Sequence, residues 1–171
     1  MVFRVKLVPN DFKVPDKVAA KGFALRKLTV HDVAADFEAI KSSAAHLAHV
    51  FGPRNDWPKG LTLDRNLADL GWHETEFENR TSFCWAVWTP DTSRYRGCTY
   101  IHPSQKVGVD AEIIMWVTKF EFDNGFDREL FQFFSSWIKD SWPFKNPVYP
   151  GRSLGWVDYD RLPNGQARDS Q

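Results

Sequence analysis

The stretch Asp110–Trp142, DAEIIMWVTKFEFDNGFDRELFQFFSSWIKDSW, predicts a strand, a bend and a helix in direct succession. Residues 110–118 hold an apolar run that is too dense for a strand exposed on one face, which favours a strand covered on both faces. Residues 123–125 (Asp-Asn-Gly) are typical of a turn. From residue 127 onward, apolar side chains recur at helical spacing. A strand that leads into a helix N-terminus directs free backbone N–H groups at one point, and such a point can bind a phosphate.

The flanking segments predict further elements and one domain. We expect a strand at 23–28, helices from the N-caps Thr29 (to about residue 50) and Thr62 (to about residue 80), and strands at 82–89, 97–102 and 147–154. Short connections make the three strands at 82–89, 97–102 and 110–118 an antiparallel meander. Within the second helix, Gly71 could cause a bend, and one face should bury Leu63, Leu67, Leu70 and Phe77. We expect an N-terminal extension over 1–22, the domain over 23–163 and a flexible tail over 164–171.

Charge and composition limit the classes of partner. The chain has 22 Lys and Arg residues and 22 Asp and Glu residues, so its formal net charge is zero. This balance argues against nucleic acid or a membrane surface as a partner recognised by bulk charge. The N-terminus lacks the apolar core of a signal peptide, and no apolar run has the length of a membrane helix. We therefore expect a cytoplasmic protein.

Cysteine and histidine are too sparse to predict a metal site. Cys84 and Cys98 lie in expected strands, where two buried free thiols are favoured over a disulfide, although one disulfide could form. The histidines are scattered, and we predict no bound metal. The chain is rich in aromatic residues, with eight Trp and fourteen Phe. They could form an aromatic core or, in part, an aromatic-lined cleft. The cleft candidates are Trp57, Trp72, Trp85 and Trp88, of which the last two point to opposite faces of one strand.

The order of the expected elements over roughly residues 23–154 resembles the GNAT superfamily, the acyl-CoA-dependent N-acyltransferases. This resemblance implies a mixed, mostly antiparallel sheet flanked by helices, in the α/β (α+β) class. It also implies that strand 110–118 diverges from strand 147–154 and that acyl-CoA lies in the opening. The chain departs from the family in two places. Its loop Lys119–Arg128 has a single glycine where the family carries an Arg/Gln-x-x-Gly-x-Gly/Ala pattern, and two acids, Asp123 and Asp127, stand near the expected phosphate positions. Only a short C-terminal portion follows Leu154.

The resemblance implies a set of residues that contact acetyl-CoA as a co-substrate. Backbone groups of the strand end would hydrogen-bond the pantetheine arm, and the loop with the start of the helix would bind the pyrophosphate. Gly125 could let the backbone approach the pyrophosphate closely, and the side chains of Lys119 and Arg128 could offset the charge of the nearby acids. The expected contacts are Trp116, Val117, Thr118, Lys119, Asn124, Gly125, Phe126 and Arg128.

Two residues are candidates for proton transfer. Glu112 lies early in an apolar strand, where burial would raise its pKa and suit it to act as a base near neutral pH. Alternatively, it pairs with a nearby Arg or Lys or points into solvent. Tyr149 could protonate the departing thiolate, or it could be a surface or capping group. Arg152 could bind a carboxylate or phosphate or brace its own turn, and His73 could shape an acceptor pocket or be a structural residue.

Three functional hypotheses remain open. The first is an N-acyltransferase that moves an acetyl or acyl group from acyl-CoA to a small-molecule amine, with Glu112 as the base. The second is a non-catalytic module that binds a ligand or partner chain on the same fold. The third is a structural domain whose exposed sheet edge is covered by a second copy in a homodimer.

Overall fold

The computed structural model describes residues 5–165, which form one six-stranded sheet in the order β1-β2-β3-β4-β5-β6. Neighbouring strands are antiparallel except β5 and β6, which are parallel. The predicted mixed, mostly antiparallel α/β fold and its central meander are thus confirmed. The strands are β1 (Lys17–Ala20), β2 (Phe23–Lys27), β3 (Phe83–Trp88), β4 (Tyr95–His102), β5 (Ala111–Val117) and β6 (Pro147–Val148).

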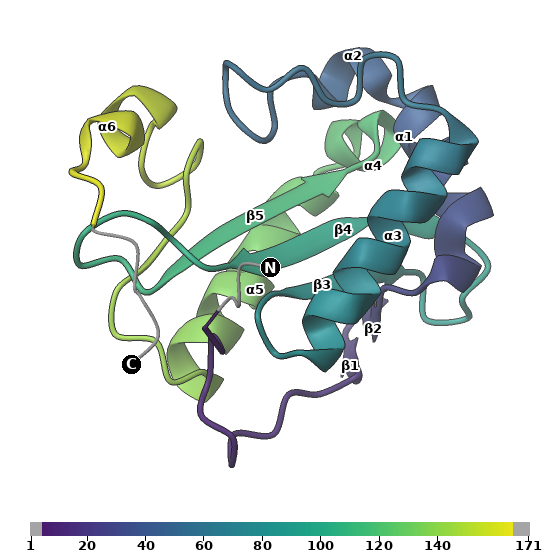
Figure 1. Ribbon diagram of the computed structural model, residues 1–171. Helices are drawn as coiled ribbons and strands as arrows, with labels where there is room; N and C mark the ends of the chain where they lie inside the picture. The colour runs from purple at the N-terminus through teal and green to yellow at the C-terminus, as the bar shows by residue number, and fades with distance from the viewer. Residues whose placement is uncertain (1–4, 166–171) are drawn as a thin grey trace.

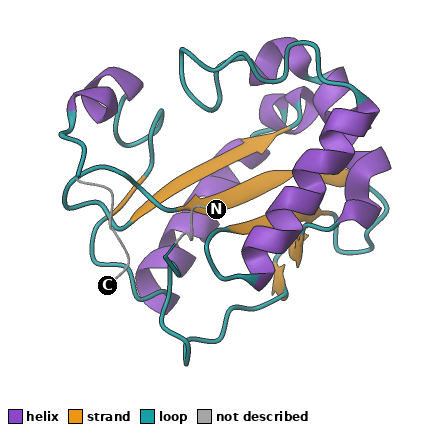
Figure 2. Cartoon of the chain, in the orientation of Figure 1, coloured by secondary structure: helices purple, strands orange, loops and turns teal. Residues whose placement is uncertain are grey.

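Helices cover both faces of the sheet. Figure 1 shows α3 crossing one face and α5 lying behind the other, and Figure 2 shows the same layers by element type. The helices are η1 (Val30–Asp32), α1 (Val33–Ser42), α2 (Ala44–Leu47), α3 (Leu63–Glu78), α4 (Lys119–Asp123), α5 (Phe126–Ser141) and α6 (Trp156–Arg161). None of these helices is both long and apolar enough to cross a membrane.

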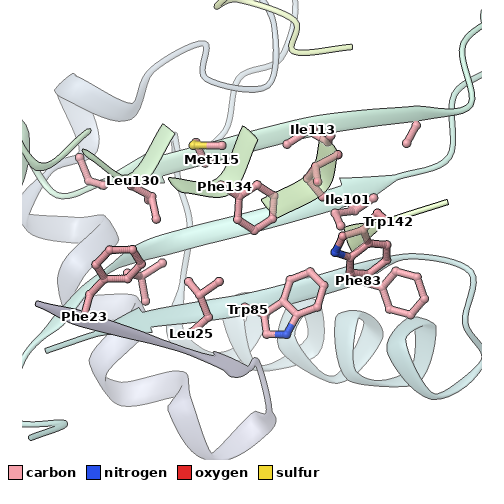
Figure 3. Close-up of a cluster of buried hydrophobic side chains, with 14 of the residues drawn as sticks. Phe23, Leu25, Phe83, Trp85, Ile101, Ile113, Met115, Leu130, Phe134 and Trp142 are labelled. Atoms are coloured by element: carbon pink, nitrogen blue, oxygen red, sulfur yellow. The ribbon is translucent and has the colours of Figure 1, made fainter. Parts of the chain in front are cut away.

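Alternating residues of the central strands divide the interior into two cores, because successive side chains of a strand point to opposite faces. Odd-numbered residues such as Trp85 and Met115 pack against α5, while even-numbered residues such as Tyr100 and Trp116 face α1 and α3. Figure 3 shows the first of these cores, in which rings from β3 and the end of α5 meet aliphatic side chains of β5. We refer below to the α5 face and the α1/α3 face.

Several local predictions need correction. The sheet begins inside residues 1–22, because β1 pairs with β2. The helix expected from Thr29 is divided into η1, α1 and α2, and the expected bend before residue 126 contains the short helix α4. In α3, Gly71 causes no break, and its carbonyl accepts a hydrogen bond from Thr75 Oγ1 at 2.8 Å.

The apolar stripe predicted for α3 is half wrong. Leu70 and Phe77 are buried as expected, but Leu63 and Leu67 are 48% and 44% exposed. The polar Asn66 is buried in their place. At the other end of the chain, residues 166–171 of the expected tail lie outside the described residues, while Gly165 N donates to Gln105 O at 2.7 Å.

Candidate functional site

A cleft opens where β5 and β6 part. The two strands pair only at Ala111–Pro147 and Glu112–Val148, so the rest of the β5 edge is not covered by β6. Of the strand expected over residues 147–154, only Pro147–Val148 forms, so the chain leaves the sheet after Val148. A cavity of about 290 Å³ lies against this edge. Its lining residues are His46, Leu47, Ala48, His49, Val50, Ile114, Met115, Trp116, Val117, Phe122, Asp127, Pro150, Gly151, Arg152 and Trp156.

Arg152 crosses this cleft from the segment after β6. Its guanidinium forms a bidentate ion pair with Asp127, with N–O distances of 2.8 and 2.9 Å, and its Nη2 donates to Met115 O at 3.2 Å. Both side chains of the pair are 22% exposed. The guanidinium of Arg152 thus has a structural partner, because the carboxylate that it binds belongs to the first turn of α5 in the same chain.

Trp156, at the start of α6, closes one side of the cleft. Its indole lies so near Gly151 that a Cβ there would come within 2.5 Å of Nε1, and Gly151 also has φ of +78°. A side chain at this position would therefore be both strained and in collision. On its other side the indole packs against Gly52, and Arg54 pairs with Asp160 at 3.2 Å. The segment after β6 is thus tied to the loop after α2.

The expected pyrophosphate site is more ordered than a loop. Thr118 Oγ1 caps α4 by accepting from Glu121 N at 3.3 Å. The amides of Asn124 and Gly125 already donate to Phe120 O and Phe122 O, at 3.2 and 3.0 Å. Gly125 has φ of +83°, and a Cβ there would meet no atom within 4 Å, so its role is conformational and the space beside it is open.

The charged groups around this site balance within the chain. Lys119 forms an ion pair with Asp123, just as Arg152 does with Asp127. Both acids that stand near the expected anion position are therefore compensated. Arg128 is exposed on α5, whereas Phe126 is buried under the guanidinium of Arg96, 3.3 Å from the ring centroid. Among the expected cofactor contacts, Trp116 and Val117 line the cleft directly.

Glu112 lies on the α1/α3 face at the last residue pair between β5 and β6. Burial raises its pKa, while a hydrogen bond with Ser104 and the charge of Lys106 act in the opposite direction. The hydroxyl of Tyr159 donates to Glu112 Oε1, and Ser104 Oγ lies 3.2 Å from that hydroxyl. Glu112 is thus a half-buried carboxylate held in place by hydroxyl groups and available to accept a proton.

The tyrosine that contacts Glu112 is not Tyr149. The ring of Tyr149 packs against Phe131 of α5, with centroids 5.4 Å apart, and burial raises its pKa to about 12. It therefore belongs to the α5 face. Tyr159 comes from α6, which sequence reasoning missed. Its signal was Trp156 and Tyr159 three residues apart after Gly155, the spacing of one helix face.

A second cavity, of about 260 Å³, lies on the α1/α3 face between the two helices, β4 and the loop at 51–57. Asp36 lies at this cavity, accepting hydrogen bonds from Tyr95 OH at 2.6 Å and Asn66 Nδ2 at 2.7 Å. Burial raises the pKa of Asp36 to about 6, although these two hydrogen bonds lower it. His73 also lines the cavity, and burial lowers its pKa to about 4, so this imidazole is neutral at pH 7.

The aromatic candidates fall in different places. Trp57 lines the second cavity, whereas Trp72 is 59% exposed on α3. Trp85 is buried on the α5 face, and Trp88 lies on the α1/α3 face under Arg26, 4.8 Å from the ring centroid. The prediction that Trp85 and Trp88 point to opposite faces is therefore confirmed, and only part of the aromatic content lines a cavity.

Cys84 and Cys98 are buried free thiols with their sulfur atoms 3.2 Å apart, as the favoured interpretation predicted. His102, at the end of β4, stacks on Tyr100 and shares a 2.8 Å hydrogen bond with Ser82 Oγ. Within residues 5–165, no group of three or more His, Cys, Asp or Glu side chains is arranged to hold a metal ion.

Comparison with known proteins finds similar structures but no similar sequence. No family model and no curated protein matches the sequence. Among solved structures, the self-immunity acetyltransferase MccE, determined with acetyl-CoA and AMP, is 11% identical with a TM-score of 0.63, over 80% of this chain and 73% of that one. A GnaT-family acetyltransferase of Bordetella pertussis is 13% identical with a TM-score of 0.60, over 79% and 77%.

The ribosomal-protein-S5-alanine acetyltransferase of Vibrio fischeri is also similar, at 11% identity and a TM-score of 0.57, over 71% of this chain and 66% of that one. Identities this low show the fold and nothing finer. Together with the mixed, mostly antiparallel sheet, these likenesses show that the chain has the GNAT acetyltransferase fold.

Proposed function

We propose that the chain is an N-acyltransferase that moves an acetyl or acyl group from acyl-CoA to the amine of a small molecule. The observation that carries this proposal is the cleft at the edge of β5 that β6 leaves uncovered. Ile114 to Val117 and Asp127 of the first turn of α5 line this cleft, and Glu112 is the last residue of β5 that pairs with β6. Structures of the same fold include one bound to acetyl-CoA and AMP and one bound to coenzyme A.

The β5 edge fits the amide-bearing arm of acyl-CoA. An extended chain can add to an exposed strand edge by backbone hydrogen bonds, and the edge at Trp116 and Val117 lies inside the cavity. At the far end, the N-terminus of α5 offers a favourable field for a pyrophosphate. Lys119, Asn124, Gly125 and Arg128 lie near that end, with Asp123 and Asp127 neutralised by their ion pairs.

Glu112 would remove the ammonium proton, directly or through a water molecule. When bound, acyl-CoA supplies an activated thioester carbonyl. The free amine nitrogen then forms the new C–N bond, the C–S bond breaks, and the thiolate leaves with a proton from a nearby acid. Tyr159, whose hydroxyl contacts Glu112, is our candidate for that acid in place of Tyr149. General acid–base catalysis of this kind contributes typically 10²–10⁴-fold to a rate.

One observation favours a second candidate, a non-catalytic binding module. The Arg152 guanidinium occupies part of the β5 edge through its hydrogen bond to Met115 O. A ligand arm that adds along this edge must displace it. If that displacement is too unfavourable, the cleft would serve a different ligand and no acyl transfer would occur.

Titration calorimetry with acetyl-CoA, followed by an assay for thiol release with a panel of small primary amines, tests the proposal. Glu112→Gln should keep acetyl-CoA affinity within about twofold while lowering turnover by about a hundredfold or more. Glu38→Gln, an exposed acid on α1, is the matched control and should change neither quantity. Absence of acetyl-CoA binding at millimolar concentration would exclude the acyltransferase and leave the binding module. Full turnover in Glu112→Gln would exclude Glu112 as the base.

A further inference from the structure

We propose that the cavity of about 260 Å³ on the α1/α3 face is built for a primary ammonium compound whose body is a single flat, apolar ring. This inference rests on the proposed function, because it names the chemical class of the acyl acceptor. It is argued from the position, the charge and the ring content of the cavity.

The position connects this cavity to the proposed base. His102 lines the cavity and is the direct cross-strand partner of Glu112 in the β4–β5 register. Both side chains lie on the α1/α3 face, and directly opposed residues have Cβ atoms about 5 Å apart. Through His102, the cavity therefore borders the strand pair that carries the carboxylate proposed to take the ammonium proton.

The charge of the cavity selects for a cation. Its acidic lining residues are Asp36 and Asp69, and no Lys or Arg of the described chain is among its lining residues. The His73 imidazole adds no positive charge at pH 7 because burial lowers its pKa to about 4. Asp36 accepts hydrogen bonds from Tyr95 and Asn66, so it acts through its field. Asp69 lies on the exposed side of α3 at the rim, where an ammonium group would compete with the charge of Arg65 for this carboxylate.

Three rings select for a flat, apolar body. Phe51 meets Trp57 and Tyr100 edge to face, with ring centroids 5.0 and 5.2 Å apart. Each of these rings also lines the cavity. Aromatic faces attract both ring systems and ammonium groups. The cavity volume of about 260 Å³ lies just below the usual range for small-molecule sites, so the ligand must be a compact molecule.

The test measures binding to the full chain without acyl-CoA, by calorimetry and by tryptophan fluorescence. The probes are 2-phenylethylamine, its neutral analogue 2-phenylethanol, the anion phenylacetate and the ring-free n-butylamine. We expect 2-phenylethylamine to bind at least tenfold more tightly than each of the other three. Equal affinity for the amine and the alcohol, or no binding of any probe at millimolar concentration, would overturn the inference.

Two variants separate ring recognition from charge recognition. Asp69→Asn should weaken the binding of 2-phenylethylamine about tenfold and leave the binding of 2-phenylethanol unchanged. Trp57→Leu should weaken the binding of 2-phenylethylamine and of 2-phenylethanol and leave the binding of n-butylamine unchanged. Asp140→Asn, an exposed acid at the far end of α5, is the control and should alter no affinity. Uniform losses for all probes in either variant would contradict the assigned roles, and melting temperatures show whether each variant is folded.

The two proposals fail separately. If 2-phenylethylamine binds with the expected selectivity and acetyl-CoA does not bind, the ammonium site stands and acyl transfer is excluded. If acetyl-CoA binds and other amines are acetylated while 2-phenylethylamine is neither bound nor acetylated, the acyltransferase stands and the ring-bearing acceptor class is wrong.

Discussion

The two faces of the sheet are built from alternate residues of the same strands, yet their interiors differ in kind. On the α5 face, buried side chains such as Trp85, Phe134 and Met115 form a core that is almost entirely apolar. On the α1/α3 face, the buried set includes Asp36 and Asn66, and the cavity of about 260 Å³ opens beside it. Burial of apolar surface is the dominant favourable contribution to folding, whereas buried polar groups contribute little unless they are fully hydrogen-bonded.

The comparison shows how the aromatic content is divided between stability and recognition. Rings on the α5 face pack against one another, as Trp85 does with Trp137 and Trp142 at 5.5 and 5.8 Å. Rings on the α1/α3 face, such as Trp57 and Tyr100, also border empty space. We therefore expect substitutions on the α5 face to act mainly on the free energy of unfolding and those on the α1/α3 face to act on ligands and on pH dependence.

The largest expected effect is from Trp85→Ala. This side chain has no exposed surface, and its truncation would leave a cavity that the surrounding rings cannot fill. We expect the free energy of unfolding to fall by about 3–5 kcal/mol, measured by urea denaturation. Trp72→Ala, at a side chain that is 59% exposed, should cost less than about 1 kcal/mol. Similar losses in the two variants would contradict the assignment of Trp85 to the stabilising core.

The second effect is a pH dependence from Asp36. Burial raises the pKa of this carboxyl from 3.8 to about 6, so the folded state binds a proton more tightly than the unfolded state. The resulting stabilisation is complete below pH 3.8 and is lost as the pH rises through 6. The shift corresponds to about 3 kcal/mol. Relative to wild type, Asp36→Asn should therefore gain stability by about this amount between pH 4 and pH 7.

Urea denaturation at a series of pH values measures this difference. Asp140→Asn, an exposed acid on α5, is the control and should follow the wild-type profile. A constant difference between Asp36→Asn and wild type across the series would show that Asp36 titrates at the same pH in both states. Burial of the Asp36 carboxylate on the α1/α3 face would then carry no net cost.

The sequence predicts the α5 face better than the α1/α3 face, for a physical reason. The apolar run at 111–117 and the periodicity of residues 126–141 are local patterns, and they identified β5 and α5 to within one or two residues. The side chains that meet at Glu112 are remote in sequence, since Tyr159 lies 47 residues away. It comes from α6, a helix of six residues that has little periodicity to detect.

Local patterns also leave the partner of a helix face undetermined. In α3, Leu63 and Leu67 have the same spacing relative to Leu70 as a buried stripe would have. The structure exposes the first two and buries Asn66, because Asn66 hydrogen-bonds the carboxylate of Asp36 on α1. Such a polar contact between helices depends on tertiary packing and has no signature in either helix alone.

The third prediction concerns the cleft and the ion pair that spans it. If acyl-CoA binds in this cleft, the carboxylate of Asp127 competes with the phosphates of acyl-CoA for the guanidinium of Arg152. Asp127→Asn should release the guanidinium and tighten acetyl-CoA binding several-fold, whereas Arg152→Met should weaken it about tenfold because Asp127 is left unpaired. Calorimetry measures both affinities, and Glu129→Gln in the same turn of α5 is the control. Weaker binding in both variants would mean that the pair is structural and that the arginine never contacts the ligand.

The smallest effect is expected at Leu67, and it tests whether the outer surface of the α1/α3 face is free. Leu67→Gln removes an apolar side chain that is 44% exposed and keeps a good helix former, so the free energy of unfolding should change by less than about 0.5 kcal/mol. Leu70→Ala, one turn away and buried, should cost about 2–5 kcal/mol. A loss above 1 kcal/mol for Leu67→Gln that grows with protein concentration would mean that a second copy covers α3. A dimer would then form through α3, on the face that carries the cavity of about 260 Å³, and not through the sheet edge of our homodimer hypothesis. The acceptor site would have to be described in that dimer.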